Sequence, residues 1–278
     1  VPGVSVLAVV VLALAPLFLA PFATNTLSRI LVFGLLAVSL DLLVGVSGLP
    51  SLGHAAYFGI GAYAAGWVSI NVTSAIPVPL IVGAIAGAIG AAATGWITVR
   101  AHGVFFLMLT LAIGELLHQL AQTWETATGG ANGMAGIPPA QAGGEPLLLA
   151  GFVYWYVLAA FVVGFAVVLV VSKSPFGAAL RGIRDNEPRM RALGYSTRVY
   201  KYGVFVLAGS IAGMAGALLA AQQRLVTPAD LGFATAALAL LAVIIGGAGS
   251  LWGPVVGAAV EIIVRDAIGP SLDGHGAL

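Results

Sequence analysis

The sequence predicts an all-α, polytopic bundle of transmembrane helices, and three observations lead to this fold class. Hydrophobic residues make up 60% of the chain and charged residues only 8%, and the mean hydropathy is +1.07. A soluble domain carries about 25% charged residues, so most of this surface must face lipid. The apolar runs are unbroken and about 20 residues long, the length of a membrane-crossing helix. Strands of an outer-membrane barrel would instead alternate over segments of about 10 residues.

The apolar runs define about eight membrane segments. The first is too long for the core of a signal peptide, which has about 7–15 residues, and is expected to remain as a span. The last is longer than one crossing needs, and GGAGSLWGP at 246–254 interrupts it, so it is either two short helices or one kinked helix. The polar stretches are too short to form a core of their own, so residues 1–278 are expected to form a single transmembrane domain. The segments are 4–23, 30–47, 52–70, 78–98, 103–122, 147–171, 203–223 and 234–264.

The basic residues predict the orientation of the chain. Seven of the eleven Lys and Arg lie in the loop at about 172–202. Loops rich in Lys and Arg remain in the cytoplasm, so this loop and the turn at Arg100 and His102 are expected on the cytoplasmic side. The loop at 123–146 then faces outside, in agreement with its two glutamates and its lack of basic residues. The same count of spans places Arg29 outside and Arg265 inside.

The loop at 172–202 contains signals of a short structured helix. Pro175 marks a helix start, Asp185 is expected to cap a second helix at Glu187–Leu193, and Gly194 would end it. The loop could serve merely to orient the chain in the membrane. Its mixed charges and its apolar tip at Ala192 and Leu193 instead favour a docking element for a cytoplasmic partner.

The sequence offers no energy source of its own. The phosphate-loop motif GxxxxGK[ST] is absent, so ATP hydrolysis by this route and an enzymatic function are not expected. Ion coupling would need ionisable residues inside the membrane, and the candidates are Asp41, Glu115, His118 and Glu261. Each is single and near a span end, and each is interpreted as an interfacial or interhelical hydrogen-bonding group. Two alternatives stay open: a secondary transporter with its own ion coupling, and an intramembrane enzyme in which the carboxylates converge.

Two stretches with glycine and proline interrupt the apolar segments. GLPSLGHAAYFG at 48–59 and GAGSLWGPVVG at 247–257 share Ser-Leu beside a glycine. Such interruptions are a sequence signal of a transport path, because non-helical backbone in a membrane must be buried in protein or line a cavity. We predict that the two breaks face one another across a central path. The alternative is close helix packing on small residues, which the 38 glycines also favour.

A metal site is not expected. The chain has no cysteine, and His54 has no second histidine at metal-ligand spacing, so this histidine is interpreted as a hydrogen-bonded packing residue. The glycine-rich stretch TGGANGMAGIP at 128–138 does not join a strand to a helix, and it is predicted to be an outer gate or receptor-contact loop rather than a phosphate cradle.

Four stretches, in order, resemble the permease subunits of branched-chain amino acid ABC importers over about residues 30–265. They are GLPSLGHAAYFGIGAYAAG, TGGANGMAGIP, LRGIRDNEPRMRALGYSTRVYK and LAVIIGGAGSLWGPVVGAAV. The arginine-rich stretch is similar to the LivM-type rather than the LivH-type subunit. The resemblance implies a type II-like importer fold in the bacterial plasma (inner) membrane. It also implies a translocation path for leucine, isoleucine and valine, or for a related small solute such as urea or an amide.

The resemblance further implies the partners of this chain. These are a second, LivH-type permease subunit, two cytoplasmic ATPase subunits and an extracytoplasmic solute-binding protein, all in or at a lipid bilayer and without nucleic acid. ATP and Mg would bind to the ATPase subunits, and this chain would bind no cofactor. In such importers the solute-binding protein largely sets the specificity.

Carried over residue by residue, the resemblance assigns two groups of site residues. The coupling helix, which contacts the ATPase, would comprise Arg184, Asp185, Asn186, Glu187, Arg189, Ala192, Leu193 and Gly194. The breaks that line the translocation path would comprise Ser51, Gly53, His54, Phe58, Gly59, Gly247, Gly249, Ser250 and Gly253. Pro50 departs from the family pattern and could alter the first break. Pro188 is expected in the first turn of the coupling helix, where proline is tolerated.

Overall fold

The computed structural model describes residues 12–16 and 20–273, with side chains as far as Asp266. The span predicted at 4–23 therefore lies mostly outside the described residues, which include a short helical stretch at 12–16 and the start of the next helix.

The described chain is almost entirely helical, which confirms the predicted all-α class. The helices are α2 (Pro21–Asp41), the π-helix η1 (Leu42–Val46), α3 (His54–Asn71), α4 (Val78–Thr98), α5 (Val104–Thr123), α6 (Glu125–Thr128), η2 (Gly130–Asn132), α7 (Ala150–Lys173), α8 (Pro175–Asp185), α9 (Glu187–Ala192), α10 (Thr197–Gln223), η3 (Pro228–Leu231), α11 (Phe233–Gly246) and α12 (Gly253–Asp273). The strands have two residues each: β1 (Met134–Ala135), β2 (Gln141–Ala142), β3 (Glu145–Pro146) and β4 (Leu225–Val226).

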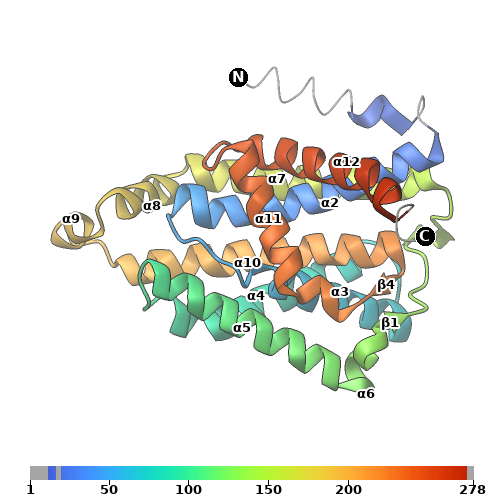
Figure 1. Ribbon diagram of the computed structural model, residues 1–278, viewed down its shortest axis with the longest axis horizontal. Helices are drawn as coiled ribbons and strands as arrows, with labels where there is room; N and C mark the ends of the chain where they lie inside the picture. The colour runs from blue at the N-terminus through green and yellow to red at the C-terminus, as the bar shows by residue number, and fades with distance from the viewer. Residues whose placement is uncertain (1–11, 17–19, 274–278) are drawn as a thin grey trace.

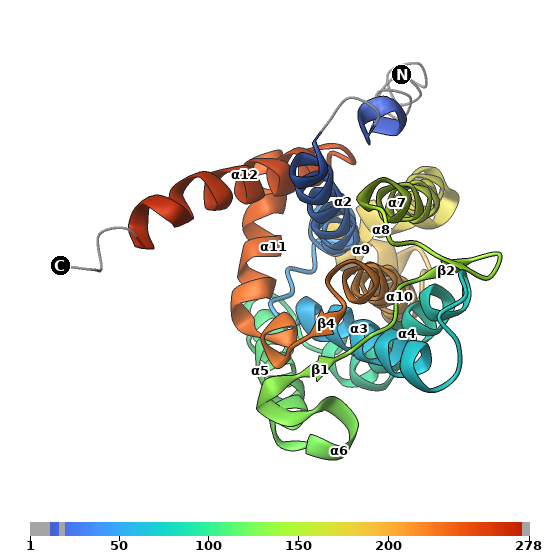
Figure 2. The same ribbon diagram turned by 90° about the vertical axis from the view of Figure 1, so that its right-hand side faces the viewer.

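The long helices lie side by side along the long axis of the molecule (Figure 1), and a view along that axis shows several of them end-on (Figure 2). Among the described residues, five helices are long and apolar enough to cross a membrane: α2 with η1, α4, α5, α7 and α10. The arrangement confirms a polytopic transmembrane bundle.

The core of the bundle forms around α2 and α10. Leu35 and Leu40 on α2 and Phe205 and Leu218 on α10 are fully buried, whereas α4 and α5 expose most of their apolar side chains. On α4, for example, Ile85 is 52% exposed. Exposure of so many apolar side chains to water would be unfavourable, whereas lipid tails are themselves apolar. The exposed faces of α4 and α5 are therefore consistent with contact to lipid.

The crossing of α3, α4 and α10 depends on glycines. A Cβ added to Gly213 on α10 would lie 2.3 Å from the carbonyl oxygen of Gly83 and 2.9 Å from the Cα of Gly87. A Cβ added to Gly61 on α3 would lie 2.2 Å from the carbonyl oxygen of Gly213. The three backbones therefore approach more closely than any side chain would allow. This packing on small residues is how helices associate where lipid supplies no hydrophobic force.

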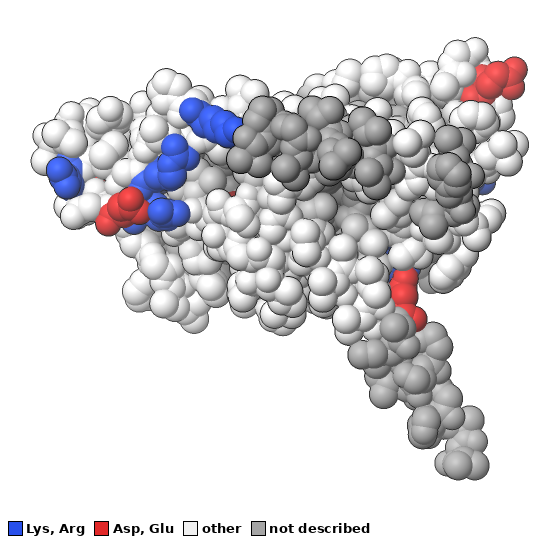
Figure 3. Space-filling view, turned by 90° about the horizontal axis from the view of Figure 1, so that it is seen from above, with Lys and Arg blue, Asp and Glu red and all other residues white. Residues whose placement is uncertain are grey.

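The two ends of the bundle differ in charge. One end, here called the basic end, carries α8, α9 and the turn between α4 and α5. Figure 3 shows Lys and Arg gathered at this end, while the described middle of that face is almost free of charged side chains. At the opposite end β1 pairs antiparallel with β4. The turn at His102 lies 3.7 Å from Glu187, so the prediction that this turn shares a side with the 172–202 loop is confirmed.

The segment predicted at 234–264 is two helices, α11 and α12, joined by a turn at 247–252. The second helix reverses direction, and this changes the position of its basic residue. Asp266, next to Arg265, pairs with Arg29 at 3.2 Å, so both arginines lie at the same level of the bundle. The predicted placement of Arg265 on the side opposite to Arg29 was therefore wrong, because the count treated 234–264 as one crossing.

Candidate functional site

The loop at 172–202 folds into two short helices that protrude from the basic end (Figure 1). Ser174 caps α8, since its Oγ accepts a hydrogen bond from the backbone N–H of Gly177 at 3.3 Å. Pro175 follows in the first turn of α8. Backbone N–H groups in a first turn have no acceptor within the helix, so proline, which has no N–H, loses no hydrogen bond there. The prediction of a helix start at Pro175 is confirmed.

The cap of α9 is Asn186 rather than Asp185. The Asn186 side-chain oxygen accepts from the backbone N–H of Arg189 at 3.0 Å, whereas Asp185 is the last residue of α8. The prediction of Asp185 as N-cap was wrong by one residue. Either side chain can cap a helix, but a cap at 186 brings Pro188 closer to the first helical position, which proline prefers.

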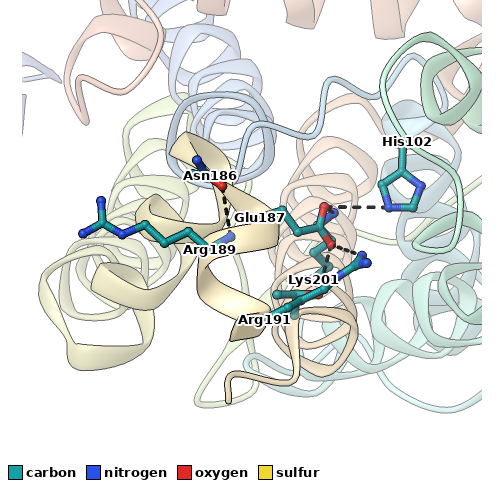
Figure 4. Close-up of polar contacts among 7 residues, drawn as sticks. His102, Asn186, Glu187, Arg189, Arg191 and Lys201 are labelled. Carbon is teal, nitrogen blue, oxygen red and sulfur yellow. Dashed lines mark hydrogen bonds and ion pairs between the residues drawn. The ribbon is translucent and has the colours of Figure 1, made fainter. Parts of the chain in front are cut away.

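Glu187 anchors α9 to the rest of the basic end (Figure 4). Its carboxylate accepts hydrogen bonds from Arg191 Nη2 at 2.6 Å, from Lys201 Nζ at 2.5 Å and from Thr197 Oγ1 at 2.9 Å. The side chain of Lys201 is only 6% exposed. Burial by itself would raise the pKa of Glu187, but the hydrogen bonds from Lys201, Arg191 and Thr197 outweigh burial and lower this pKa to about 2.

Because the pKa of Glu187 is lower in the folded protein than its ordinary 4.5, its carboxylate stabilises the fold above pH 4.5, and this contribution is lost as the pH falls toward 2. At pH 7 we expect Glu187→Gln to lower the free energy needed to detach α9 from the bundle by about 2 kcal/mol, because the hydrogen bonds from Lys201 and Arg191 lose their charged acceptor. Because about 1.4 kcal/mol corresponds to a tenfold change in population, trypsin should then cleave the purified subunit after Arg189 and Arg191 more than about tenfold faster.

Glu145→Gln, near the opposite end, is the matched control and should leave the cleavage rate unchanged. If Glu187→Gln is cleaved at the wild-type rate at pH 7, Glu187 does not anchor α9.

The outward surface of α9 is free of these internal contacts. Arg189, Ala192, Leu193 and Gly194 are exposed, and Leu193 is 66% exposed. Gly194 has a φ of +88°, a left-handed conformation that ends the helix at low cost for glycine. Of the predicted coupling residues, Glu187 therefore acts within the subunit, and the exposed tip is the part that another protein could contact.

Arg184 connects α8 to the region where α2 ends. Its Nη1 donates to the carbonyl of Gly45 at 2.5 Å. A Cβ added to Gly45 would lie 2.2 Å from the backbone nitrogen of Gly249, so the end of η1 and the 247–252 turn are in direct contact. Asp41 Oδ1 accepts from that same nitrogen at 2.7 Å. A cavity of about 350 Å³ lies at this junction, lined in part by Arg181, Arg184 and Leu251.

The first predicted break is real and is buried. Residues 47–53 form no helix between η1 and α3, and the residues assigned to it pack within the subunit. A Cβ on Gly53 would lie 2.0 Å from the carbonyl oxygen of Thr110, and a Cβ on Gly59 would lie 2.1 Å from Leu231. Phe58 is fully buried.

His54 lies at the start of α3, immediately after the first break. Its Nε2 is 2.9 Å from Ser39 Oγ, in agreement with its interpretation as a packing residue. Its Nδ1 and the hydroxyl of Ser51 are buried without a hydrogen-bond partner among the described residues.

The second predicted break is the turn between α11 and α12. Gly247, Gly249 and Ser250 are exposed there, and Ser250 Oγ donates to the carbonyl of Gly247 at 2.7 Å. A Cβ on Gly253 would lie 2.1 Å from the carbonyl oxygen of Gly246. The contact between the two regions runs through Gly45 and Gly249, and the structure does not bring the buried Ser51 and His54 together with this exposed turn.

Several of these partners have no signal in the sequence. Lys201 and His102 were counted for the sign of their charge, and no spacing in the sequence relates them to Glu187. Asp41 was interpreted correctly as an interhelical hydrogen-bonding group, but its partner at Gly249 is 208 residues away. Within the part of the chain that the structure describes, no group of His, Asp and Glu could hold a metal ion.

Comparison with known proteins gives matches over most of the chain. A family model described as "Branched-chain amino acid transport system / permease component" matches residues 22–272. No solved structure matches at a significant level.

Three named proteins illustrate the similarity. The "High-affinity branched-chain amino acid transport system permease protein LivM" of Escherichia coli (strain K12) is 28% identical over 287 residues, which cover 93% of this chain and 67% of that protein. LivM of Salmonella typhimurium is 27% identical over 288 residues, 94% of this chain and 67% of that protein. A "Probable branched-chain amino acid transport permease protein LivH" of Methanocaldococcus jannaschii is 27% identical over 243 residues, 80% of this chain and 72% of that protein.

Proposed function

The chain belongs to the family of branched-chain amino acid transport system permease components, and on that premise we propose that it is the LivM-type permease subunit of an ABC importer for branched-chain amino acids. The observation that carries this proposal is α9, a short helix at the basic end with an exposed tip at Leu193 and an internal anchor at Glu187. Such a helix fits a cytoplasmic ATPase that pushes or pulls on the bundle.

We propose α9 as the coupling helix, with the exposed Arg189, Ala192, Leu193 and Gly194 in contact with an ATPase subunit. Two ATPase subunits hydrolyse ATP with Mg, a LivH-type subunit completes the permease, and an extracytoplasmic binding protein delivers the solute. Residues 1–278 act as one permease domain in the bacterial plasma (inner) membrane, with the basic end in the cytoplasm.

Direct contacts connect the helix pair α8 and α9 to the helix breaks. Arg184, at the end of α8, holds the carbonyl of Gly45, and Gly45 contacts Gly249. We propose that ATP-driven movement of α8 and α9 shifts this junction and opens the buried break at 47–53. The Ser51 hydroxyl and His54 Nδ1 support this choice, since both are buried without a hydrogen-bond partner in the described part of the chain. An unsatisfied polar group is costly in a closed state and gains partners where water or a solute enters.

Uptake measurements test the proposal. In proteoliposomes that contain this chain with its second permease, ATPase and binding-protein partners, we expect uptake of radiolabelled leucine that requires ATP and stops when the ATPase cannot hydrolyse it. Leucine uptake by the permease subunits alone, driven by a proton or sodium gradient, would contradict the proposal and favour a secondary transporter.

A further inference from the structure

The outer half of α5 carries a stripe of polar side chains. Glu115, His118, Gln119 and Gln122 recur at spacings of three and four residues, so they lie on one face of the helix. Glu115, Gln119 and Gln122 are exposed, whereas the other side of α5 is buried against the bundle at Thr110, Gly114 and Ala121. The four residues Glu115, His118, Gln119 and Gln122 are called the α5 stripe below.

The α5 stripe is too deep to face lipid. The helix ends at Thr123, eight residues after Glu115, so Glu115 lies about 12 Å inside that end and close to the middle of α5. The prediction that Glu115 lies near a span end was therefore wrong. An ionisable side chain at such a depth is costly in hydrocarbon and faces either a water-filled space or other protein. The inner half of the same face is apolar and exposed at Val104 and Met108, so the polar character belongs to the outer half alone.

Two other acidic side chains on the spans have partners within this chain. Asp266 pairs with Arg29 at 3.2 Å, and Asp41 accepts the backbone N–H of Gly249. In the described structure Glu115 accepts a hydrogen bond from Gln119 Nε2 at 3.1 Å and forms no ion pair. Its exposed carboxylate is therefore left without a cationic partner among the described residues.

The α5 stripe is held in place by η3. His118 Nδ1 lies 2.8 Å from the carbonyl oxygen of Pro228, and a carbonyl can accept only, so Nδ1 donates. The His118 Nε2 then accepts from Gln122 Nε2 at 2.9 Å. The face is therefore ordered before any solute arrives.

The α5 stripe also adjoins the first helix break. A Cβ added to Gly114 would lie 2.9 Å from the Cα of Gly53, so the two backbones are in close contact. The backbone N–H of Leu52 donates a hydrogen bond to Thr110 Oγ1 at 3.3 Å. Glu115 thus follows directly after the point at which α5 crosses the break, and its side chain lies on the exposed face.

We propose that the α5 stripe lines the outer, water-filled half of the substrate path and that the Glu115 carboxylate receives the ammonium group of the solute. This inference rests on the proposed function and deepens it. An ammonium group donates up to three hydrogen bonds and carries the charge that a carboxylate attracts, whereas urea and simple amides carry no charge. The solute that fits this site therefore carries a free ammonium group, as an amino acid does.

Thiol labelling tests the site without a transport assay. This chain has no cysteine, so a single-cysteine variant is labelled at one position when the reaction is measured on this subunit after it is separated from its partners. In the assembled importer, Gln119→Cys should react with the cationic trimethylammonium-ethyl methanethiosulfonate faster than with its anionic sulfonatoethyl counterpart. Adding Glu115→Gln should reduce this preference by about tenfold, since the attracting charge is gone. Ile85→Cys, on the exposed apolar face of α4, is the control and should react with neither reagent. If Gln119→Cys is as unreactive as Ile85→Cys, the stripe is covered by protein and the inference is wrong.

Uptake by the complete importer supplies the second measurement. Glu115→Gln should reduce leucine uptake by about tenfold, and Glu115→Asp should restore part of it because the charge returns. Wild-type uptake by Glu115→Gln would overturn the assignment of the ammonium site. If the wild-type importer itself takes up no leucine under ATP, the proposed function fails, whereas the labelling result still decides whether the stripe faces water.

Discussion

The double substitution Arg189→Glu with Leu193→Asp is expected to abolish ATP-driven leucine uptake while leaving the subunit folded in the membrane. Both side chains are exposed on the outward surface of α9, and neither takes part in the Glu187 network. In the proposed complex, Arg189 and Leu193 are buried against the ATPase subunit. Truncating such a residue costs about 2 kcal/mol or more in binding, and an aspartate in its place adds desolvation of a charge.

Co-purification measures this effect directly. The ATPase subunits should no longer be retained by the tagged permease, and ATP hydrolysis should no longer respond to the solute-loaded binding protein. Arg198→Glu is the matched control, because Arg198 is also exposed and lies in the first turn of α10, outside α9. Retention of the ATPase by the double variant at the wild-type level would remove α9 from the role of coupling helix.

The single substitution Gly213→Ala is expected to have the largest effect on stability. The added methyl group would lie 2.3 Å from the carbonyl oxygen of Gly83 and 2.9 Å from the Cα of Gly87. These contacts are backbone atoms of α4, so no side chain can rotate away and the helices must separate. Overpacking typically costs about 1–3 kcal/mol, and a collision with backbone belongs at or above the upper end of that range.

Thermal unfolding of the detergent-purified subunit, followed by tryptophan fluorescence, should show a clear fall in the midpoint for Gly213→Ala. Gly151→Ala is the control, because an added Cβ there meets no atom within 4 Å, and alanine is the better helix former. Equal midpoints for the two variants would mean that the α4–α10 crossing adapts easily and does not hold the bundle together.

The positions of the helices were largely predictable from the chain. Apolar run length, the helix start marked by Pro175 and the tolerated position of Pro188 in a first turn depend on neighbouring residues in the sequence. The structure begins α8 at Pro175 and places Pro188 in the first turn of α9. The choice between Asp185 and Asn186 as cap failed because both side chains have the same local chemistry. The structure distinguishes them because α8 extends to Asp185, which leaves Asn186 as the residue before α9.

The helix breaks were found at the correct places, but their surroundings were not predictable. Glycine-rich sequence is compatible both with a path and with close packing. In the structure Gly53 and Gly253 each lie against a backbone carbonyl, which depends on how α5 and α11 approach. Glu115 was interpreted as an ordinary hydrogen-bonding group, and its importance emerged from its exposure on the face of α5 that the bundle leaves uncovered.

The order of the amino acids alone was enough to identify lipid as the main solvent of this protein, its helical class, the family resemblance and the end of the bundle that carries positive charge. These properties follow from composition, run length and short motifs, which are additive or local. The tertiary structure alone decided that Glu187 faces inward, that Arg184 reaches Gly45 and that Gly45 meets Gly249. Such contacts join residues up to about two hundred positions apart, and they arise only when packing of whole helices brings distant backbones to within hydrogen-bond distance.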